Sequence, residues 1–408
     1  MNCRHCKKSL KLNLVDLGFA PPSNAYLYKD DLKNPEKYYP LIIKVCENCW
    51  LVQTEDYRAA DELFLSDYAY FSSTSLSFLE HAKEYVESIS KKLSLNKDSM
   101  VTELASNDGY LLKNFLNMQI PCLGIEPTKS TAQESEKLGI ETIQEFFGEK
   151  LARKLLSDGY SSDLIIGNNV YAHVPDINDF TKGIQILLKK DGVVTLEFPH
   201  LLKLMQGSQF DTIYHEHFSY LSLFTVSRIF QENGLKVFDV DEIPTHGGSL
   251  RIYGCNNSDP REITNNFKNV INAEKRYGLQ ESATYKNFQN KVEIIKNELI
   301  GFLIEKKKAG KKVAAYGAAA KGNTLLNYAG IKSDLISFVC DAAHAKQGKY
   351  LPGSHIPIHP PDKLKSFAPD YVVILPWNIA GEITEQNRSL IKNGTRFVSF
   401  VPKLTYHD

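Results

Sequence analysis

The sequence predicts an α/β protein in which a parallel, doubly wound sheet lies between a small cysteine-containing module and a second α/β unit. Segments with strand and helix periodicity alternate from residue 76 to residue 198, as they do in doubly wound sheets. A further strand–loop–helix unit begins near residue 313. Two Cys-x-x-Cys pairs precede both units. We therefore expect three parts, at residues 1–75, 76–258 and 259–408.

The composition narrows the class of protein. A chain of 408 residues is longer than a domain with a single hydrophobic core usually is, so several domains are expected. Lys and Arg total 48, as do Asp and Glu, and no basic tract stands out, which argues against a nucleic-acid or membrane partner. The first residues are polar, and no apolar run is long enough to span a bilayer. We expect a cytoplasmic protein, and the sequence carries no signal for its oligomeric state.

The two Cys-x-x-Cys pairs are Cys3 with Cys6 and Cys46 with Cys49. Each pair places two thiolates at a spacing that a tetrahedral ion accepts, and two pairs close the coordination shell. A closed shell of four thiolates is typical of structural Zn²⁺, which contributes to folding and leaves no open position for catalysis. The alternative is two disulfides, which a cytoplasmic setting disfavours. His5 is a candidate competing ligand.

Segment 51–75 is a connector after the second pair and is rich in aromatic and hydroxyl side chains, among them Tyr68, Tyr70 and Ser72. Such side chains suit a small polar ligand such as a sugar, and they equally suit packing against the next domain. We take Tyr70 and Ser72 as candidate substrate-binding residues.

The central part is predicted to begin with a helix over residues 76–95, because apolar residues recur there at helical spacing. The expected strands of the sheet are 100–104, 121–126, 141–143, 163–167 and 192–198, with helices at 110–116, 129–138, 148–156 and 177–189 between them. A helix and two more strands are expected within 225–253, and a helical hairpin within 260–308. Ligands of such a sheet bind at the carboxyl ends of its strands.

Polar and small residues gather at those strand ends. The loop after the first strand consists mostly of residues with small side chains, which let a ligand approach the backbone closely. A carboxylate at the end of the second strand can accept from both hydroxyls of an adenosine ribose. Two side-chain amides end the fourth strand. The candidate cofactor-binding residues are Glu103, Ala105, Asn107, Gly109, Glu126, Asn168 and Asn169.

The first loop distinguishes between two cofactors. The Gly-x-Gly-x-x-Gly run that admits a pyrophosphate is absent, because Ala105, Ser106 and Asn107 stand where glycines are needed. Glu103 would repel a phosphate, whereas it would attract the amino group or sulfonium of S-adenosylmethionine. The electrostatics therefore favour the methyl donor over NAD.

Residues 214–220 carry two imidazoles, a carboxylate and two phenols in seven positions. Such a cluster can abstract, hold and pass a proton near neutral pH. The alternative is a loop whose rings pack and whose histidines are solvated. From the sequence itself, His215 and His217 are equivalent candidates for a base.

The C-terminal unit offers a phosphate site. A loop of small residues is followed at a helix start by Lys321 and Asn323, so that backbone amides and one ammonium can hold a phosphate. Asn378 follows a later strand and faces the same crevice. The alternative is a Rossmann-like unit that only packs. His246, in the turn at 246–249, is a further candidate substrate-binding residue.

The run 103–112, Glu-Leu-Ala-Ser-Asn-Asp-Gly-Tyr-Leu-Leu, resembles the first motif of the deoxysugar C-methyltransferases. The two cysteine pairs and the runs 168–173, 214–220 and 246–251 match the same family in the same order, so the resemblance covers essentially the whole chain. It implies a Rossmann-like class I methyltransferase domain between a zinc-binding module and a C-terminal α/β domain. It also implies methyl transfer from S-adenosylmethionine to a ring carbon, with carbon 3 expected, of a nucleotide-linked 4-keto-6-deoxyhexose, commonly dTDP-linked.

The resemblance also implies roles for individual residues. His217 would be the base that forms an enolate, and Glu216 and Tyr214 would position it or relay protons. His173 and Tyr68 would contact the sugar or its enolate. Two other functions stay open at this point: an NAD-dependent nucleotide-sugar oxidoreductase or epimerase, and a catalytically inactive zinc-containing scaffold of polysaccharide synthesis.

Overall fold

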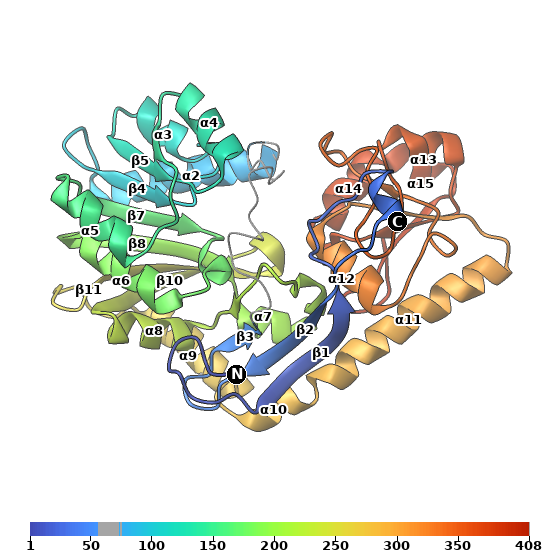
Figure 1. The fold of residues 1–408 in the computed structure, drawn as a ribbon, viewed down its shortest axis with the longest axis horizontal. Helices are drawn as coiled ribbons and strands as arrows, with labels where there is room; N and C mark the ends of the chain where they lie inside the picture. The colour runs from blue at the N-terminus through green and yellow to red at the C-terminus, as the bar shows by residue number, and fades with distance from the viewer. Residues whose placement is uncertain (56–72, 74–75, 408) are drawn as a thin grey trace.

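The structure is a computed structural model that describes residues 1–55, 73 and 76–407, and three sheets organise these residues (Figure 1). Their strand orders are β1-β2-β3-β9, β10-β11-β8-β7-β4-β5-β6 and β14-β13-β12-β15-β16-β17. Strands β1 and β2 lie between the two larger sheets (Figure 1). The α/β class and the Rossmann-like central domain are confirmed.

The N-terminal sheet is antiparallel and takes one strand from far along the chain. Its members are β1 (Leu12–Ala20), β2 (Tyr39–Val45), β3 (Val52–Thr54) and β9 (Ser219–Tyr220). Strand β3 pairs with β9 through Val52 opposite Tyr220 and Gln53 opposite Ser219. The end of the run 214–220 is therefore a strand of the N-terminal sheet.

The central sheet contains the five parallel strands that the alternation predicts. They are β4 (Val101–Leu104), β5 (Cys122–Ile125), β6 (Glu141–Ile143), β7 (Ser162–Asn168) and β8 (Leu188–Pro199), followed by the antiparallel β10 (Leu235–Ile243) and β11 (Ser249–Asn256). The helices are α2 (Leu76–Leu93), α3 (Leu112–Asn117), α4 (Lys129–Lys137), α5 (Glu149–Ser157), α6 (Ile177–Leu187), α7 (Leu201–Gln206) and α8 (Leu223–Glu232). The strand order reverses between β4 and β7, which is where a doubly wound sheet binds its ligand.

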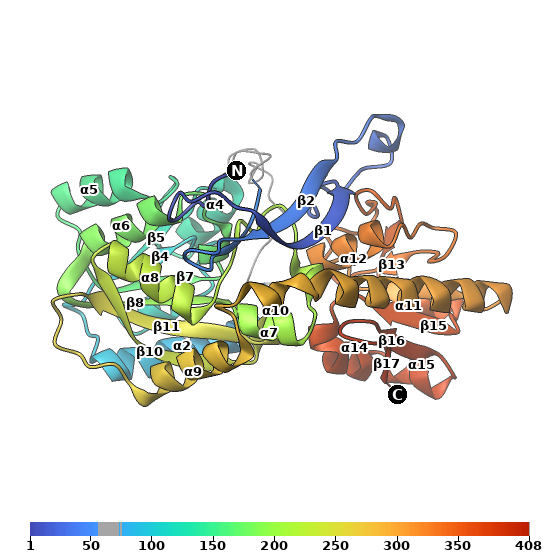
Figure 2. The same cartoon turned by 90° about the horizontal axis from the view of Figure 1, so that it is seen from below.

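A helical bridge joins this sheet to the C-terminal one. It consists of α9 (Asn265–Tyr277), α10 (Ser282–Lys286) and the long α11 (Phe288–Lys308), which runs along the C-terminal part (Figure 2). The C-terminal strands are β12 (Val313–Tyr316), β13 (Val339–Cys340), β14 (Ile358–His359), β15 (Tyr371–Ile374), β16 (Arg396–Ser399) and β17 (Thr405–His407). The helices are α12 (Ala320–Tyr328), α13 (Asp362–Phe367), α14 (Ala380–Gln386) and α15 (Arg388–Lys392). All pairs except β16–β17 are parallel.

The hydrophobic cores do not follow the three parts of the chain. Buried residues of β1 and β2, such as Leu14 and Ile43, belong to one core with Phe302 of α11 and Val398 of β16. The cysteines and Leu51 belong to a different core, together with the apolar strands of the central sheet. The N-terminal part therefore packs in two directions at once, and it depends on both larger sheets for its burial.

Among the described helices, none combines the length and the apolar character that crossing a membrane requires.

Candidate active site

The four cysteine sulfurs converge at one point. Cys3 Sγ lies 3.5 Å from Cys49 Sγ, and Cys6 Sγ lies 3.4 Å from Cys46 Sγ. All four sulfurs lie within 4.8 Å of one another. A tetrahedral Zn²⁺ with Zn–S bonds of about 2.3 Å needs sulfurs roughly 3.8 Å apart. The thiolates therefore fit a closed, structural zinc site.

His5 does not compete for this metal. Its Nδ1 lies 2.8 Å from Asn178 Oδ1, and its Nε2 lies 3.3 Å from Glu232 Oε2. Both ring nitrogens thus face other partners. The imidazole instead docks the first cysteine pair onto α6 and α8.

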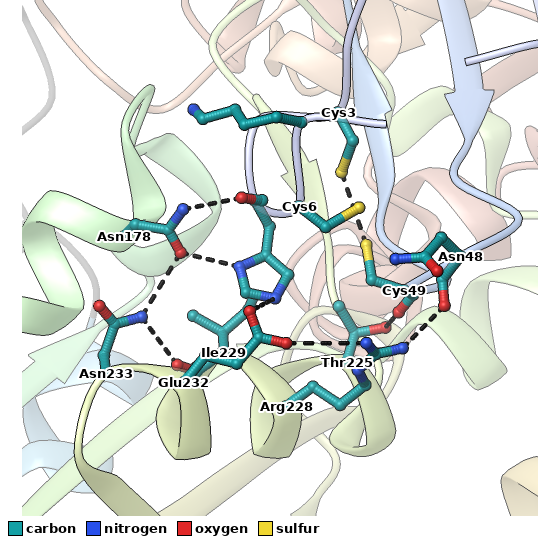
Figure 3. Close-up of polar contacts among 12 residues, drawn as sticks. Cys3, Cys6, Asn48, Cys49, Asn178, Thr225, Arg228, Ile229, Glu232 and Asn233 are labelled. Atoms are coloured by element: carbon teal, nitrogen blue, oxygen red, sulfur yellow. Dashed lines mark hydrogen bonds and ion pairs between the residues drawn. The ribbon is translucent and has the colours of Figure 1, made fainter. Parts of the chain in front are cut away.

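The second cysteine pair docks on α8 as well (Figure 3). Arg228 donates to the Asn48 carbonyl at 2.7 Å, and the Thr225 hydroxyl donates to the Cys49 carbonyl at 3.3 Å. The metal site is therefore bound directly to the central domain.

The His217 imidazole is oriented by a hydrogen bond through one of its ring nitrogens. Its Nδ1 lies 2.9 Å from the Thr212 carbonyl, which only accepts, so Nδ1 carries the proton and Nε2 keeps its lone pair. The Tyr214 ring packs on it at a centroid distance of 4.0 Å, and the His173 ring lies at 4.7 Å. Burial, helped by the proximity of His173, holds the pKa of His217 well below its usual range. The imidazole is therefore neutral at neutral pH.

His215 faces the other way. Its Nε2 lies 3.3 Å from the Tyr39 carbonyl and 3.2 Å from the Pro40 carbonyl of β2. The structure thus separates two imidazoles that are equivalent in the sequence. One is tied to the N-terminal sheet, and the other lies among the histidines of the central domain.

Glu216 is buried, and its Oε2 accepts from Asn24 Nδ2 at 2.6 Å. Burial raises the pKa of its carboxyl to about 7. The carboxyl can therefore take up or release a proton at neutral pH.

Two further histidines lie beside His217. Burial lowers the pKa of His173, which follows β7, to about 4. It also lowers the pKa of His246 to about 4. His246 has φ 57°, its ring meets Phe78 edge-on at 5.5 Å, and its Nε2 has no hydrogen-bond partner among the described residues. Two neutral imidazoles thus lie near the candidate base.

The cofactor candidates lie at the carboxyl ends of β4, β5 and β7. Glu103 is buried with Oε2 lacking a hydrogen-bond partner among the described residues, and burial raises the pKa of its carboxyl well above the usual range. A ligand that brings an amino group there would satisfy this oxygen and favour the carboxylate. The positive φ values of Ala105, Asn107 and Gly109 (56°, 51° and 75°) fold the loop tightly beside it.

Glu126 is fixed by two amides. Its Oε2 accepts from the Asn107 amide and its Oε1 from the Thr128 amide, both at 2.9 Å. Each carboxylate oxygen keeps a further lone pair that can accept from a ribose hydroxyl. At the end of β7, Asn168 Oδ1 is buried without a hydrogen-bond partner within the described chain, and the Asn169 amide donates to the Glu197 carbonyl at 2.8 Å.

Two of the C-terminal candidates, Lys321 and Asn378, contact each other. Lys321 Nζ donates to Asn378 Oδ1 at 2.6 Å and lies 5.0 Å from the centre of the Trp377 ring. Burial lowers the pKa of Lys321. Asn323, by contrast, is fully buried and donates through Nδ2 to the Ser23 carbonyl at 2.6 Å. Its amide group thus holds the N-terminal segment in place.

Sequence reasoning missed several residues of this region. Asp211 is fully buried and accepts from Trp377 Nε1 at 2.7 Å, and burial raises its pKa to about 6. Asn24 was missed because no local pattern marks it. Glu197 and Arg251, which form a buried ion pair, had a usable signal, since each is a charged residue within an apolar strand. The predicted Tyr68, Tyr70 and Ser72 lie outside the described residues.

Comparison with known proteins agrees with this geometry. Family models match a putative zinc-binding domain at residues 3–64, a methyltransferase domain at 78–240 and a C-methyltransferase C-terminal domain at 244–402. The C-methyltransferase NovU of Streptomyces niveus is 32% identical over 401 residues, which cover 98% of this chain and 95% of NovU.

Solved methyltransferases resemble part of the chain. One, an S-adenosylmethionine-dependent methyltransferase from Clostridium acetobutylicum ATCC 824, is 10% identical over 43% of this chain and 91% of its own, with a TM-score of 0.35. Another, magnesium protoporphyrin IX methyltransferase (ChlM) from Synechocystis PCC 6803 with bound SAH, is 14% identical over 42% and 82%, with a TM-score of 0.34.

The fold and the site define an S-adenosylmethionine-dependent methyltransferase with a structural zinc site. The chain belongs to the family of C-methyltransferases that includes NovU. This membership decides against the NAD-dependent oxidoreductase and the inactive scaffold.

Replacing one zinc ligand should destabilise the protein. In Cys46→Ser the tetrahedron loses a thiolate, so we expect less bound zinc and a lower melting temperature, measured by metal analysis and thermal unfolding. Cys122→Ser, at a half-buried cysteine outside the cluster, is the matched control. Full zinc content in Cys46→Ser would contradict the assignment.

Replacing Glu126 should weaken cofactor binding. Glu126→Gln turns one accepting oxygen into a donor that faces a backbone amide, at a cost of about 1–3 kcal/mol, or roughly 5- to 150-fold in the Kd of S-adenosylhomocysteine. Calorimetric titration measures this Kd. Glu145→Gln, at an exposed carboxylate paired with Lys154, is the control, and equal affinity of the two variants would exclude the proposed contact.

Proposed function

We propose that this C-methyltransferase methylates the carbon next to the ketone of a nucleotide-linked 4-keto-6-deoxyhexose, with carbon 3 as the position and dTDP as the carrier. The observation that carries this proposal is the buried, neutral imidazole of His217, whose Nε2 is available while Nδ1 is anchored to the Thr212 carbonyl. Carbon methylation needs a carbanion equivalent, and a base beside an acidic C–H provides it.

The reaction begins when His217 Nε2 takes the proton from the carbon beside the ketone, which leaves an enolate. When bound, S-adenosylmethionine would supply the methyl group to the enolate carbon, and the electron pair of the broken carbon–sulfur bond would leave with S-adenosylhomocysteine. The Nδ1 contact to Thr212 keeps the imidazole oriented as it becomes charged. Transfer in line depends on positioning, which rigid contacts provide.

Neighbouring residues assist this base. Tyr214 stacks on the imidazole, and Glu216, with a pKa near neutrality, can take part in moving the proton onward. His173, whose ring centroid is 4.7 Å from that of His217, would contact the enolate oxygen or a sugar hydroxyl. Tyr68 is assigned to the same contact from the family resemblance.

The two ligands are assigned to different strand ends. Glu103 would pair with the amino group of the methyl donor, Glu126 with its ribose, and Ala105, Asn107 and Gly109 would border it, with Asn168 and Asn169 on the opposite side. The sugar nucleotide would lie between the central and C-terminal sheets, where Lys321 and Asn378 offer a cation and an amide to a diphosphate. His246, Tyr70 and Ser72 would face the sugar. Asn323 would support the side of the site that these residues line.

The division into residues 1–75, 76–258 and 259–408 follows the same roles: zinc binding, methyl-donor binding and sugar-nucleotide binding. We keep it as a division by function and not by packing, because the N-terminal part shares hydrophobic cores with both of the other parts.

A panel of sugar nucleotides tests the substrate class. The zinc-loaded enzyme and S-adenosylmethionine are incubated with dTDP- and GDP-linked 4-keto sugars, with their 4-hydroxy counterparts as controls. We expect mass spectrometry to detect one added methyl group on a dTDP-linked 4-keto sugar and none on the alcohols, whose C–H is not acidic. Methylation of the alcohols, or of no keto sugar, would overturn the proposal.

Two histidine variants test the base. His217→Asn keeps a donor at the position of Nδ1, so we expect an intact loop, retained binding of S-adenosylhomocysteine and turnover lowered by about 10²- to 10⁴-fold. His215→Gln keeps a donor at the position of Nε2 and should turn over almost normally. Near-normal turnover of His217→Asn would remove His217 from this role.

A further inference from the structure

Arg4, between the first two zinc ligands, reaches both histidine-bearing loops. Its side chain is buried, with Nη1 donating to the Pro175 carbonyl at 2.8 Å and Nη2 donating to the Thr54 carbonyl at 3.0 Å. The guanidinium also lies 5.2 Å from the centre of the Phe218 ring. Pro175 closely follows His173 in the sequence, and Phe218 directly follows His217. One guanidinium thus contacts both of the segments that carry the His173 and His217 imidazoles.

Strand β3 holds the second of these segments directly. The Thr54 amide donates to the Phe218 carbonyl at 3.2 Å, and the Thr54 hydroxyl donates to the His217 carbonyl at 3.3 Å. The main chain of the candidate base is therefore bound by a residue of the N-terminal sheet.

Gln53 connects this strand to the metal site. It is fully buried; Nε2 donates to Cys3 Sγ at 3.3 Å, and Oε1 accepts from the Arg4 amide at 2.9 Å. Its main chain pairs with Ser219, two residues after His217. A continuous set of hydrogen bonds therefore runs from a zinc ligand to the backbone of the candidate base.

The chemistry of Arg4 suits a positioning role. A planar guanidinium donates in two fixed directions and can hold two carbonyls at a set separation, which the single ammonium of a lysine does not reproduce. Its flat face packs on an aromatic ring at the same time. The carbonyls it joins belong to two segments that are far apart in the chain.

We propose that Arg4 and Thr54 are positioning residues for methyl transfer, which set the separation of the His173 and His217 imidazoles and couple it to the zinc site. The proposal rests on the role of His217 in the proposed function. It assigns the zinc-binding module a part in aligning the base, in addition to its part in folding. Neither residue touches the reacting atoms.

Four variants test the coupling, each assayed with the sugar that the panel identifies. Arg4→Met keeps the apolar stem and removes the fork, and Thr54→Val removes one hydroxyl at nearly constant shape. We expect kcat to fall roughly 10- to 100-fold in both, as for a base displaced by about 1 Å, with little change in KM or in the Kd of S-adenosylhomocysteine. Thr54→Ser, which restores the hydroxyl, should recover most of kcat. Arg228→Met, which also loosens a contact to the module but touches neither loop, should leave kcat near normal.

Two readouts other than activity accompany these rates. Metal analysis should show zinc retained in Thr54→Val, because Thr54 does not contact a cysteine. Hydrogen–deuterium exchange of a peptide that covers residues 214–220 should be faster in Thr54→Val than in Thr54→Ser.

The outcomes separate this proposal from the assignment of the base. If Thr54→Val and Arg4→Met turn over normally while His217→Asn is inactive, the positioning role is excluded and the base stands. If His217→Asn is active, the proposed base itself fails. If Arg4→Met loses zinc, its kcat no longer tests the positioning role, and the two Thr54 variants test it instead. Equal kcat values for Thr54→Val and Thr54→Ser would then overturn the coupling.

Discussion

The pairing of β3 with β9 is the contact on which the arrangement of the site depends. It involves only Val52 with Tyr220 and Gln53 with Ser219, yet it joins the strand after the second cysteine pair to the end of the histidine loop. Two residue pairs alone would contribute little stability, since isolated short strands are marginal in water. The zinc site and the Arg4 guanidinium, linked to β3 through Gln53 and Thr54, supply the rigidity that this short pairing lacks. One network of contacts therefore connects a zinc-binding cysteine with the backbone of His217.

The electrostatics of the site follow from burial. Burial lowers the pKa of His173, His217 and His246, and the neighbouring imidazoles lower that of His217 further. Burial instead raises the pKa of the Glu216 carboxyl to about 7 and that of the Asp211 carboxyl to about 6. The three imidazoles are therefore neutral at neutral pH before ligands arrive, and the Glu216 carboxyl is partly protonated. The proposed neutral base and enolate would suit such buried surroundings, where a developing charge is stabilised more strongly than in water.

The sequence predicted the features that local pattern determines. Five parallel strands followed from alternating periodicity, and the cysteine cluster from its spacing, because both are encoded by neighbouring residues. Thr54 and His217, in contrast, are 163 residues apart and meet through a two-residue strand that has no periodicity to detect. Residue type and spacing did not rank His215 against His217; the family resemblance favoured His217, and tertiary packing separates the two through the carbonyls they contact. Asn323 sits at the expected helix start, but its amide is used by Ser23, a residue from the other end of the chain.

The division of the N-terminal part between two cores bears on how the chain comes to be folded. Strand β1 packs against α10, α11 and α12, and β3 pairs with β9 on the edge that β2 does not cover; these helices and β9 are all synthesised much later. During translation the first strands would therefore emerge with an unpaired edge and exposed apolar side chains, a state prone to association. The two cysteine pairs can close around a metal as soon as both have emerged, since all four ligands precede residue 50. Early metal capture would keep this segment compact while it waits for the rest of the chain.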